Sequence, residues 1–274
     1  MKIAFLGPIA SFSYEAALRL FLKATLSPVE TIPLVFSSVD SSKAEFGIVP
    51  LENSIDGSIS PVLDALTVTK LVIVAEYYLD VKQCFLSNEK DISKINKIFS
   101  HPQGFAQCRT WIAKNFPKAE LIECSSTARA AERASKEKFC GAIASESCAK
   151  EFLIKLVNKG IQDLDGNKTR FVVISKPENS SKFVLPKNAK FKTSILFSVK
   201  DKPGSLFDAL KAFKEFNVNM TKIESRPSKK NAWEYVFFID LDGKVTDPPL
   251  SNALKEIEKH CEYVKILGSY SRVE

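Results

Sequence analysis

The sequence predicts an α/β domain of two lobes, followed by a smaller α+β domain. Three observations lead to this prediction. Strand-like and helix-like segments alternate up to residue 174, a polar stretch with two prolines covers 177–190, and the element order beyond it changes to βαββαβ. A chain of 274 residues with 45% hydrophobic content is long enough for roughly two domains with a sizeable core.

The first lobe begins with a predicted strand at 2–6 and a helix at 13–22. A second strand covers 45–51, and a short helix follows Pro61. The stretch 70–87 is apolar and rich in β-branched residues, which predicts two strands that lead to the second lobe.

The second lobe repeats the alternation. Its predicted elements are strand 97–99, helix 105–115, strand 120–124, an Ala-rich helix to about 138, strand 140–144 and a helix from 145. The β-branched and aromatic run 171–174 predicts a buried strand that returns to the first lobe, so the two lobes enclose a cleft. The polar turn before this strand would fix Asn167 and Thr169 on a rigid support.

The C-terminal segments predict a ferredoxin-like βαββαβ domain. Its expected strands are 193–200, 218–224, 234–241 and 263–270, with helices at 204–215 and 250–261. We therefore expect a first domain at 1–178, with lobes at about 1–75 plus 165–178 and 76–164, a linker at 179–191 and a second domain at 192–274.

Charge and cysteine usage restrict the class of protein. The 39 Lys and Arg against 32 Asp and Glu give a net charge of +7, which suits nucleic acid, an acidic membrane surface or an anionic small molecule. The chain carries no helix-turn-helix, zinc-finger or RNA-binding motif and no run long enough to span a membrane. Gly7-Pro8 interrupts the N-terminal apolar residues too early for a secretory signal. Six scattered cysteines and two histidines predict reduced thiols in a cytoplasmic protein and no metal site.

Polar residues recur where predicted strands meet helices. They are Ser11 and Ser13, Asn53 and Ser54, Ser100 and Gln103, and Ser126 and Thr127. Each can present a hydroxyl or a backbone N–H at the edge where open α/β sheets bind anions, but Ser and Thr are also common helix N-caps. Glu52 is either a cleft carboxylate that moves protons or a solvated loop charge. Converging from two lobes, these loops would suit a small polycarboxylate.

Taken together, five segments resemble the ordered motifs of prephenate dehydratases. They are Gly7-Pro8 with Ser11-Phe12-Ser13, Val49 to Ser54, Ser100 to Gln103, Ser126 to Ala128, and Asn167 to Phe171. Lys202 to Leu206 and Asn219 to Pro227 resemble the phenylalanine-binding ACT-type regulatory domain of the same family. The resemblance spans nearly the whole chain. It implies a periplasmic-binding-protein-like catalytic domain with an interlobe cleft and a C-terminal ACT domain.

The resemblance also implies an activity. A lyase of this family converts prephenate to phenylpyruvate, carbon dioxide and water on the route to L-phenylalanine, without a cofactor or a metal. Arogenate is an alternative substrate. A third reading is a catalytically silent, two-lobed binding protein that senses amino acids.

Site residues follow from the matched motifs. Thr169 takes the position of the principal catalytic residue, which hydrogen-bonds or protonates the departing hydroxyl. Further residues are expected to bind and orient substrate: Glu52, Asn53, Ser54, Ser100, Gln107, Ser11, Ser13, Thr127 and Arg170. Because side chains alternate along a strand, Thr169 in the cleft would turn Arg170 away from it.

The regulatory domain is expected to bind L-phenylalanine between paired domains, which implies a homodimer or a homotetramer. The residues that match the family's ligand motifs are Gly204, Ser205, Leu206, Asn219, Glu224, Ser225 and Arg226. The first catalytic motif departs from the family pattern at Ile9, Ala10 and Ser11, where an acidic residue, Gly and Thr are expected. Ala10 gives up glycine's backbone freedom, which puts the shape of this loop in question.

Overall fold

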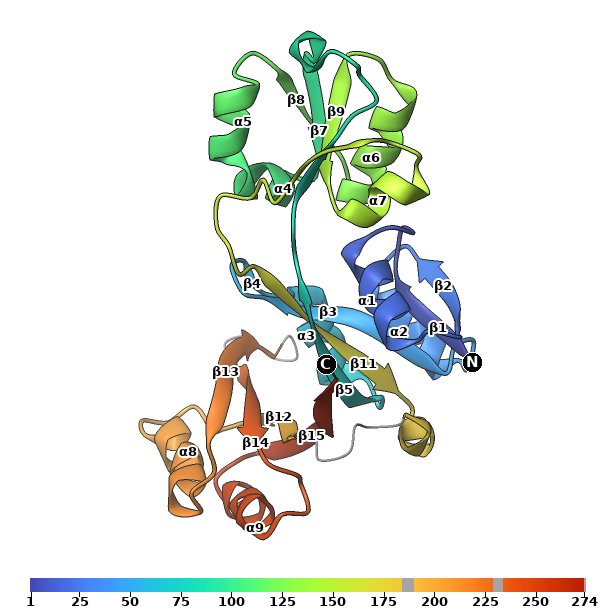
Figure 1. The fold of residues 1–274 in the computed structure, drawn as a ribbon. Helices are drawn as coiled ribbons and strands as arrows, with labels where there is room; N and C mark the ends of the chain where they lie inside the picture. The colour runs from blue at the N-terminus through green and yellow to red at the C-terminus, as the bar shows by residue number, and fades with distance from the viewer. Residues whose placement is uncertain (184–189, 229–233, 274) are drawn as a thin grey trace. The chain divides into compact units, whose positions relative to one another are not determined.

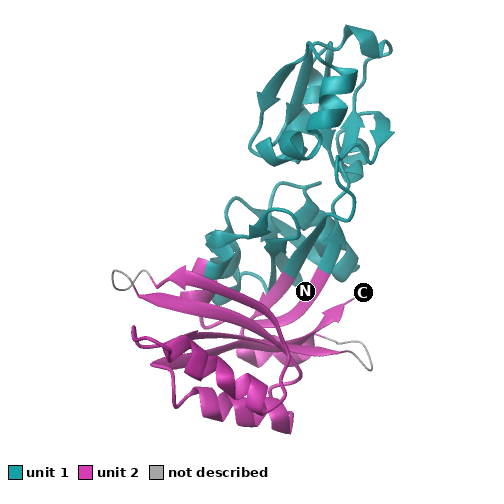
Figure 2. Ribbon diagram, turned by 90° about the vertical axis from the view of Figure 1, so that its left-hand side faces the viewer, with its two compact units in different colours: residues 1–63, 78–171 teal, residues 64–77, 172–274 magenta. Residues whose placement is uncertain are grey.

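The computed structural model describes two compact units of the chain (Figures 1 and 2). The described residues are 1–183, 190–228 and 234–273. Unit 1 comprises residues 1–63 and 78–171, and unit 2 comprises residues 64–77 and 172–274. Residues 184–189 of the expected linker 179–191 lie outside the described residues.

The first lobe of unit 1 is built on a parallel sheet. Its elements are β1 (Lys2–Leu6), α1 (Phe12–Leu20), β2 (Thr25–Val29), α2 (Ile32–Asp40), β3 (Phe46–Asn53) and β4 (Gly57–Ser58). β1 pairs in parallel with β2 on one side and with β3 on the other, while β4 pairs antiparallel with the end of β3. Helices α1 and α2 pack against this sheet. The parallel arrangement places the carboxyl ends of β1 and β3 at the same edge.

The second lobe of unit 1 contains a separate sheet in the order β10-β6-β9-β7-β8. Its elements are β6 (Cys84–Leu86), a 3-10 turn at Ile92–Lys94, β7 (Lys97–Ser100), α4 (Pro102–Gln107), α5 (Arg109–Asn115), β8 (Glu120–Glu123), α6 (Thr127–Lys136), β9 (Cys140–Ala144), α7 (Glu146–Glu151) and β10 (Leu156–Lys159). Four alanines of α6 are buried against β7 and β9, because their small side chains let the helix lie close to the strands. The two-lobed α/β architecture that the sequence predicts is confirmed.

Three elements contain residues of both units: α3 (Ser60–Val68), β5 (Val72–Asp80) and β11 (Lys168–Ser175). All residues of β11 after Lys168 are buried, as expected for a strand rich in β-branched and aromatic residues. Its first half, up to Phe171, belongs to unit 1 and carries Thr169.

Unit 2 contains the predicted βαββαβ domain. The 3-10 helix η2 (Pro177–Lys182) precedes this domain, whose elements are β12 (Phe191–Ser198), α8 (Ser205–Glu215), β13 (Met220–Pro227), β14 (Tyr235–Asp242), α9 (Pro248–Ile257) and β15 (Tyr263–Val273). The strands are ordered β13-β14-β12-β15, and α8 and α9 pack on one face of them (Figure 2). β15 then pairs in parallel with β5, where Gly268 allows the close approach of the Ile73 carbonyl.

Besides the two-residue strand β4, two elements of the first lobe are not predicted from the sequence. β2 contains Pro28, which lowers its strand propensity, but β2 lies at the end of the sheet order, where a missing N–H is tolerated. α2 is short and rich in β-branched residues; Pro33 in its first turn and Thr31 as N-cap start it. Within the described residues, no helix is both long and apolar enough to cross a membrane.

Candidate active site

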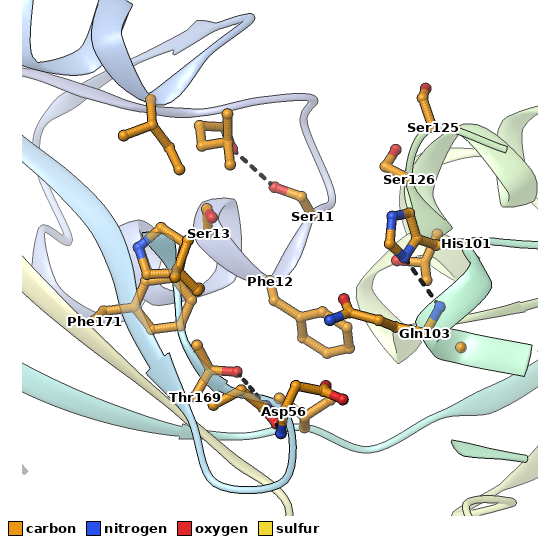
Figure 3. A pocket seen from close by; sticks show the side chains of 18 of the residues that line it. Ser11, Phe12, Ser13, Asp56, His101, Gln103, Ser125, Ser126, Thr169 and Phe171 are labelled. Carbon is orange, nitrogen blue, oxygen red and sulfur yellow. Dashed lines mark hydrogen bonds between the residues drawn. The ribbon is translucent and has the colours of Figure 1, made fainter. Parts of the chain in front are cut away.

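A pocket of about 470 Å³ lies in unit 1 (Figure 3). Its walls come from the carboxyl end of β1, the start of α1, the β3–β4 turn, the segment before β6, α4, the start of α6 and β11. The side chain of Phe12 points into the middle of the pocket. Strand ends and helix starts from both lobes therefore line one cavity, as expected of ligand sites in open α/β sheets.

Thr169 lies on one wall of this pocket and is 8% exposed. Phe171, two residues further along β11, lines the same pocket. Arg170 lies between them, is buried outside the pocket lining, and its Nη1 is 3.7 Å from Glu52 Oε2. Strand alternation thus presents Thr169 to the pocket and Arg170 to the other face.

The Asn53 amide holds the Thr169 hydroxyl in place. Asn53 Nδ2 donates to Thr169 Oγ1 at 3.0 Å and to Asn167 Oδ1 at 2.8 Å. Its Oδ1 accepts from the backbone N–H groups of Ile55 and Asp56 at 3.0 and 3.1 Å, which fixes which end of the amide faces Thr169. Because Thr169 Oγ1 accepts this bond, its own proton points elsewhere and can be donated to a ligand.

Ser54 positions the strand rather than the ligand. Its Oγ accepts from the Lys168 N–H at 2.9 Å, and its own N–H donates to the Lys168 carbonyl at 2.9 Å. The residue before Thr169 is therefore clamped on both sides of its backbone. Ser54 therefore contacts the strand that carries Thr169 and does not line the pocket.

Serine residues cap two of the helices that begin at the pocket. Ser11 caps α1 by accepting from the Tyr14 N–H at 3.2 Å, and Ser126 caps α6 by accepting from the Arg129 N–H at 3.1 Å. Ser13 and Thr127 lie in the first turns and line the pocket. The N-terminal ends of helices attract anions through free N–H groups and the helix dipole. The described lining contains the carboxylates of Glu30 and Asp56 but neither Lys nor Arg.

Three side chains form a hydrogen-bonded relay along the pocket wall. Gln83 Nε2 donates to Gln107 Oε1 at 3.0 Å, and Gln107 Nε2 donates to Asp56 Oδ2 at 3.3 Å. Gln107 is a residue that the sequence comparison with the family singles out. Gln83 is not singled out, because it lies in the stretch 70–87, which the sequence predicts to hold two strands; the polar pair Lys82-Gln83 is the available signal.

Other predicted residues lie away from the pocket lining. Ser100 is fully buried and donates to the Ile143 carbonyl at 3.0 Å, and it lies directly under Gly104 of α4, where a larger residue would meet its hydroxyl. Glu52 pairs with Arg170, as described above. His101 and Gln103 do line the pocket, with His101 Nδ1 accepting from the Gln103 N–H at 3.3 Å.

The loop with the altered motif adopts an unusual conformation at Ala10, whose φ is +65°. Its carbonyl accepts hydrogen bonds from Ser145 Oγ, Ser147 Oγ and Cys148 Sγ, at 3.2 to 3.3 Å. Ala10 thus keeps the left-handed backbone that glycine adopts most easily. The contacts to the start of α7 secure this loop of the first lobe to the second lobe.

No cysteine is among the described residues that line the pocket around Thr169. All six lie within the described residues and are free thiols. Burial raises the pKa of Cys108 to about 12 and that of Cys148 to about 11, so both thiols stay protonated at neutral pH. Within the described part of the chain, no cluster of His, Cys, Asp or Glu is placed to hold a metal ion.

The C-terminal motif residues lie in unit 2. Gly204, with φ of +86°, precedes α8, which begins with Ser205 and Leu206. Glu224 and Arg226 are half-buried on β13, and Ser225 between them is exposed. Arg226 Nη2 contacts Asp64 Oδ1 of α3 at 3.1 Å. Asn219 Nδ2 donates to Asp242 Oδ2 at 2.7 Å.

Comparisons with known proteins cover nearly the whole chain. Residues 3–179 match the family model described as prephenate dehydratase, and residues 193–259 match that of the ACT domain. A bifunctional chorismate mutase/prephenate dehydratase of Aquifex aeolicus is 41% identical over 99% of this chain and 74% of its own length. A prephenate dehydratase of Methanocaldococcus jannaschii is 40% identical over 86% of this chain and 84% of its own length. An arogenate dehydratase/prephenate dehydratase of Arabidopsis thaliana is 33% identical over 98% of this chain and 72% of its own length.

Solved structures extend the similarity to the fold. A prephenate dehydratase from Arthrobacter aurescens in complex with L-Phe has a TM-score of 0.89 at 30% identity, covering 99% of this chain and 90% of that one. GqqA, described as a novel type of quorum quenching acylase, has a TM-score of 0.87 at 28% identity, covering 100% and 98% of the two chains.

Proposed function

Because the chain belongs to the prephenate dehydratase family and has the lyase activity of that family, we propose that the pocket around Thr169 is where prephenate reacts. Prephenate would lose its ring carboxylate as carbon dioxide and its ring hydroxyl as water, giving phenylpyruvate. Formation of the aromatic ring drives the reaction. The protein's task is therefore to hold a dianion in one orientation and to help the hydroxyl depart.

The observation that carries this proposal is the bond from Asn53 Nδ2 to Thr169 Oγ1. It leaves the Thr169 proton as the donor available to a ligand in the pocket. Placed against the ring hydroxyl, that donor would stabilise the negative charge that develops on the departing oxygen. One well-placed donor of this kind contributes roughly 3 kcal/mol to transition-state stabilisation.

We propose that the helix starts, rather than basic side chains, hold the two carboxylates. The first turns of α1 and α6 both face the pocket, with Ser11, Ser13 and Thr127 at its wall. Backbone N–H groups and hydroxyls at these positions suit carboxylate oxygens. The polar residues where strands meet helices would then bind the substrate in addition to capping the helices.

Arogenate remains a second candidate substrate. It carries an ammonium where prephenate has a keto group, and the carboxylates of Asp56 and Glu30 at the pocket wall favour a cation. The dual name of the Arabidopsis thaliana relative supports testing both substrates.

We propose that L-phenylalanine regulates the enzyme through unit 2. The complex of the Arthrobacter aurescens relative supports this ligand, and Gly204, Ser205, Glu224 and Arg226 match the ligand motifs of the ACT domain. Helix α3 provides the connection between ligand motif and pocket. It follows the pocket residues Ser58 and Ile59, and in unit 2 its Asp64 pairs with Arg226.

Lys265 of β15 strengthens the same connection. Its Nζ donates to the carbonyls of Leu66 and Thr67 at 2.8 and 3.2 Å, and to that of Thr69. A cation at the C-terminal end of α3 is stabilised by the helix dipole. A ligand that shifts β13 or β15 would thus move α3.

We further propose that the protein is a homodimer or a homotetramer in the cytoplasm. β13 ends the strand order and exposes Ile223 and Ser225, and Phe207 on α8 is 70% exposed. An edge strand with apolar residues suits pairing with a second copy. The six free thiols support a reducing compartment.

Incubation of the purified protein with prephenate, and separately with arogenate, tests the proposal. We expect phenylpyruvate from prephenate, with a rate that responds to added L-phenylalanine. Phenylalanine formed from arogenate at a higher kcat/KM would select the second substrate. Turnover of neither substrate would contradict the proposed function.

A further inference from the structure

One buried acceptor at the pocket has no partner within the described residues. Gln83 is 3% exposed and lines the pocket, and its Oε1 accepts no hydrogen bond there. A buried amide oxygen that receives no hydrogen bond destabilises the folded protein. We propose that Gln83 orients the substrate, with its Oε1 accepting a hydrogen bond from the substrate's ring hydroxyl.

The charge of Asp56 determines which end of Gln83 meets the substrate. An ionised carboxylate only accepts, so Gln107 must turn its Nε2 toward Asp56 and its Oε1 toward Gln83. Gln83 must then turn its Nε2 toward Gln107, which it does at 3.0 Å. The remaining group of Gln83 is an oxygen, and only a hydrogen-bond donor can satisfy it.

The chemistry of the ligand identifies the donor. This step rests on the proposed function, because it takes prephenate as the ligand. With both carboxylates ionised, prephenate has one hydrogen-bond donor, the ring hydroxyl; its carboxylate and keto oxygens only accept. The oxygen of Gln83 and the single donor of prephenate are therefore complementary.

Gln83 and Thr169 are fixed by the same turn. Asn53 accepts from the Asp56 N–H with its Oδ1 and donates to Thr169 Oγ1 with its Nδ2, while the Asp56 carboxylate starts the relay to Gln83. A ring hydroxyl that donates to Gln83 keeps its oxygen lone pairs free for the Thr169 proton. Gln83 thus sets the direction of the O–H bond, and Thr169 meets the oxygen that leaves.

The Gln83→Met variant tests this role, because Met keeps the side-chain length and removes the acceptor. We expect kcat/KM for prephenate to fall about 30-fold, the scale of one lost hydrogen bond at a buried site. Inhibition by phenylpyruvate, which has no hydroxyl, should stay within about twofold of the wild-type value. A general loss of pocket structure would weaken both. Arogenate turnover should fall by the same factor as prephenate turnover, since both substrates carry the hydroxyl.

Gln162→Met is the matched control. Gln162 Oε1 accepts from the Gln83 backbone N–H at 3.1 Å, so this variant disturbs the same segment and leaves the Gln83 side chain in place. We expect its kcat/KM to stay within about threefold of wild type. An active wild type with a fully active Gln83→Met would overturn the role of Gln83, as would a loss confined to arogenate or an equal loss in both Gln variants. A wild type without turnover would instead overturn the proposed function and this inference with it.

Discussion

The pocket of unit 1 and the ligand motif of unit 2 are built in different ways. Hydrogen bonds within one chain connect the pocket residues. Asn53 donates to Thr169 and accepts from the Asp56 N–H, and the Gln107 amide donates to the Asp56 carboxylate. The motif residues on β13 alternate between half-buried and exposed positions on a strand that ends the sheet order. This difference agrees with the proposal that one copy of the chain completes the reaction site, whereas the regulatory site gains its second wall from a second copy.

We expect the largest effect from a substitution in the pocket of unit 1. Thr169→Val keeps the shape of the side chain and removes the donor, so kcat/KM for prephenate should fall by more than 100-fold, roughly 3 kcal/mol. Folding should be unchanged by circular dichroism. Thr110→Val, an exposed threonine of α5, is the control and should keep full activity. Turnover near the wild-type value in Thr169→Val would reject the assignment.

Asn53→Leu should have the next largest effect. It removes the donor to Thr169 Oγ1 and the acceptor for the N–H groups of Ile55 and Asp56, so Thr169 is no longer held in one rotamer. We expect a loss in kcat/KM of about 30-fold, roughly 2 kcal/mol. Steady-state kinetics measure it. A loss below about threefold would show that Thr169 is positioned without Asn53.

A smaller effect is expected where unit 2 acts on α3. Asp64→Asn removes the charge that pairs with Arg226 but keeps the size of the side chain. We expect basal kcat/KM within twofold of wild type, and a response to L-phenylalanine reduced by about 1 kcal/mol, or roughly fivefold. Calorimetry provides the second readout, since binding of L-phenylalanine should persist. An unchanged response would exclude this contact as the route of coupling.

The smallest effect concerns Ala10. Ala10→Gly would relieve the positive φ, which stabilises the folded protein by about 1–2 kcal/mol. It would also remove a buried methyl group and give the unfolded chain more freedom, and both changes lower the free energy of unfolding. We therefore expect a net change close to zero. Ala131→Gly, in α6, has no such relief and should lower the free energy of unfolding by roughly 1.5–2 kcal/mol. Denaturant titrations measure both. Equal losses would mean that Ala10 carries no strain.

The sequence is more informative about elements than about contacts. Alternating strands and helices predict the α/β lobes, and the pattern beyond residue 190 predicts the βαββαβ domain, because hydrophobic periodicity is a local property. The sequence does not predict β2, because Pro28 lowers its strand propensity. The strand forms because β2 lies at the edge of the sheet, where a proline is tolerated. The turning of Arg170 away from the pocket could be anticipated, since alternation along a strand is local too.

The relay from Asp56 through Gln107 to Gln83 could not be anticipated in the same way. It joins residues that are 51 and 24 positions apart in sequence, from both lobes and the segment between them. The burial of Ser100 away from the pocket could not be anticipated either. Its hydroxyl donates to the carbonyl of Ile143, which lies 43 positions further along the chain. Motif resemblance names residues, whereas only the packed chain shows which of them touch the pocket.

The central claim is that Asn53 acts on the reaction through the Thr169 hydroxyl. A double-mutant cycle in kcat/KM for prephenate, with Thr169→Val, Asn53→Leu and the double variant, tests it most directly. If the claim holds, the double variant will be about as slow as Thr169→Val alone, because Asn53 has nothing left to orient. Losses that simply add, to roughly 5 kcal/mol, would contradict it and leave the two residues with separate roles.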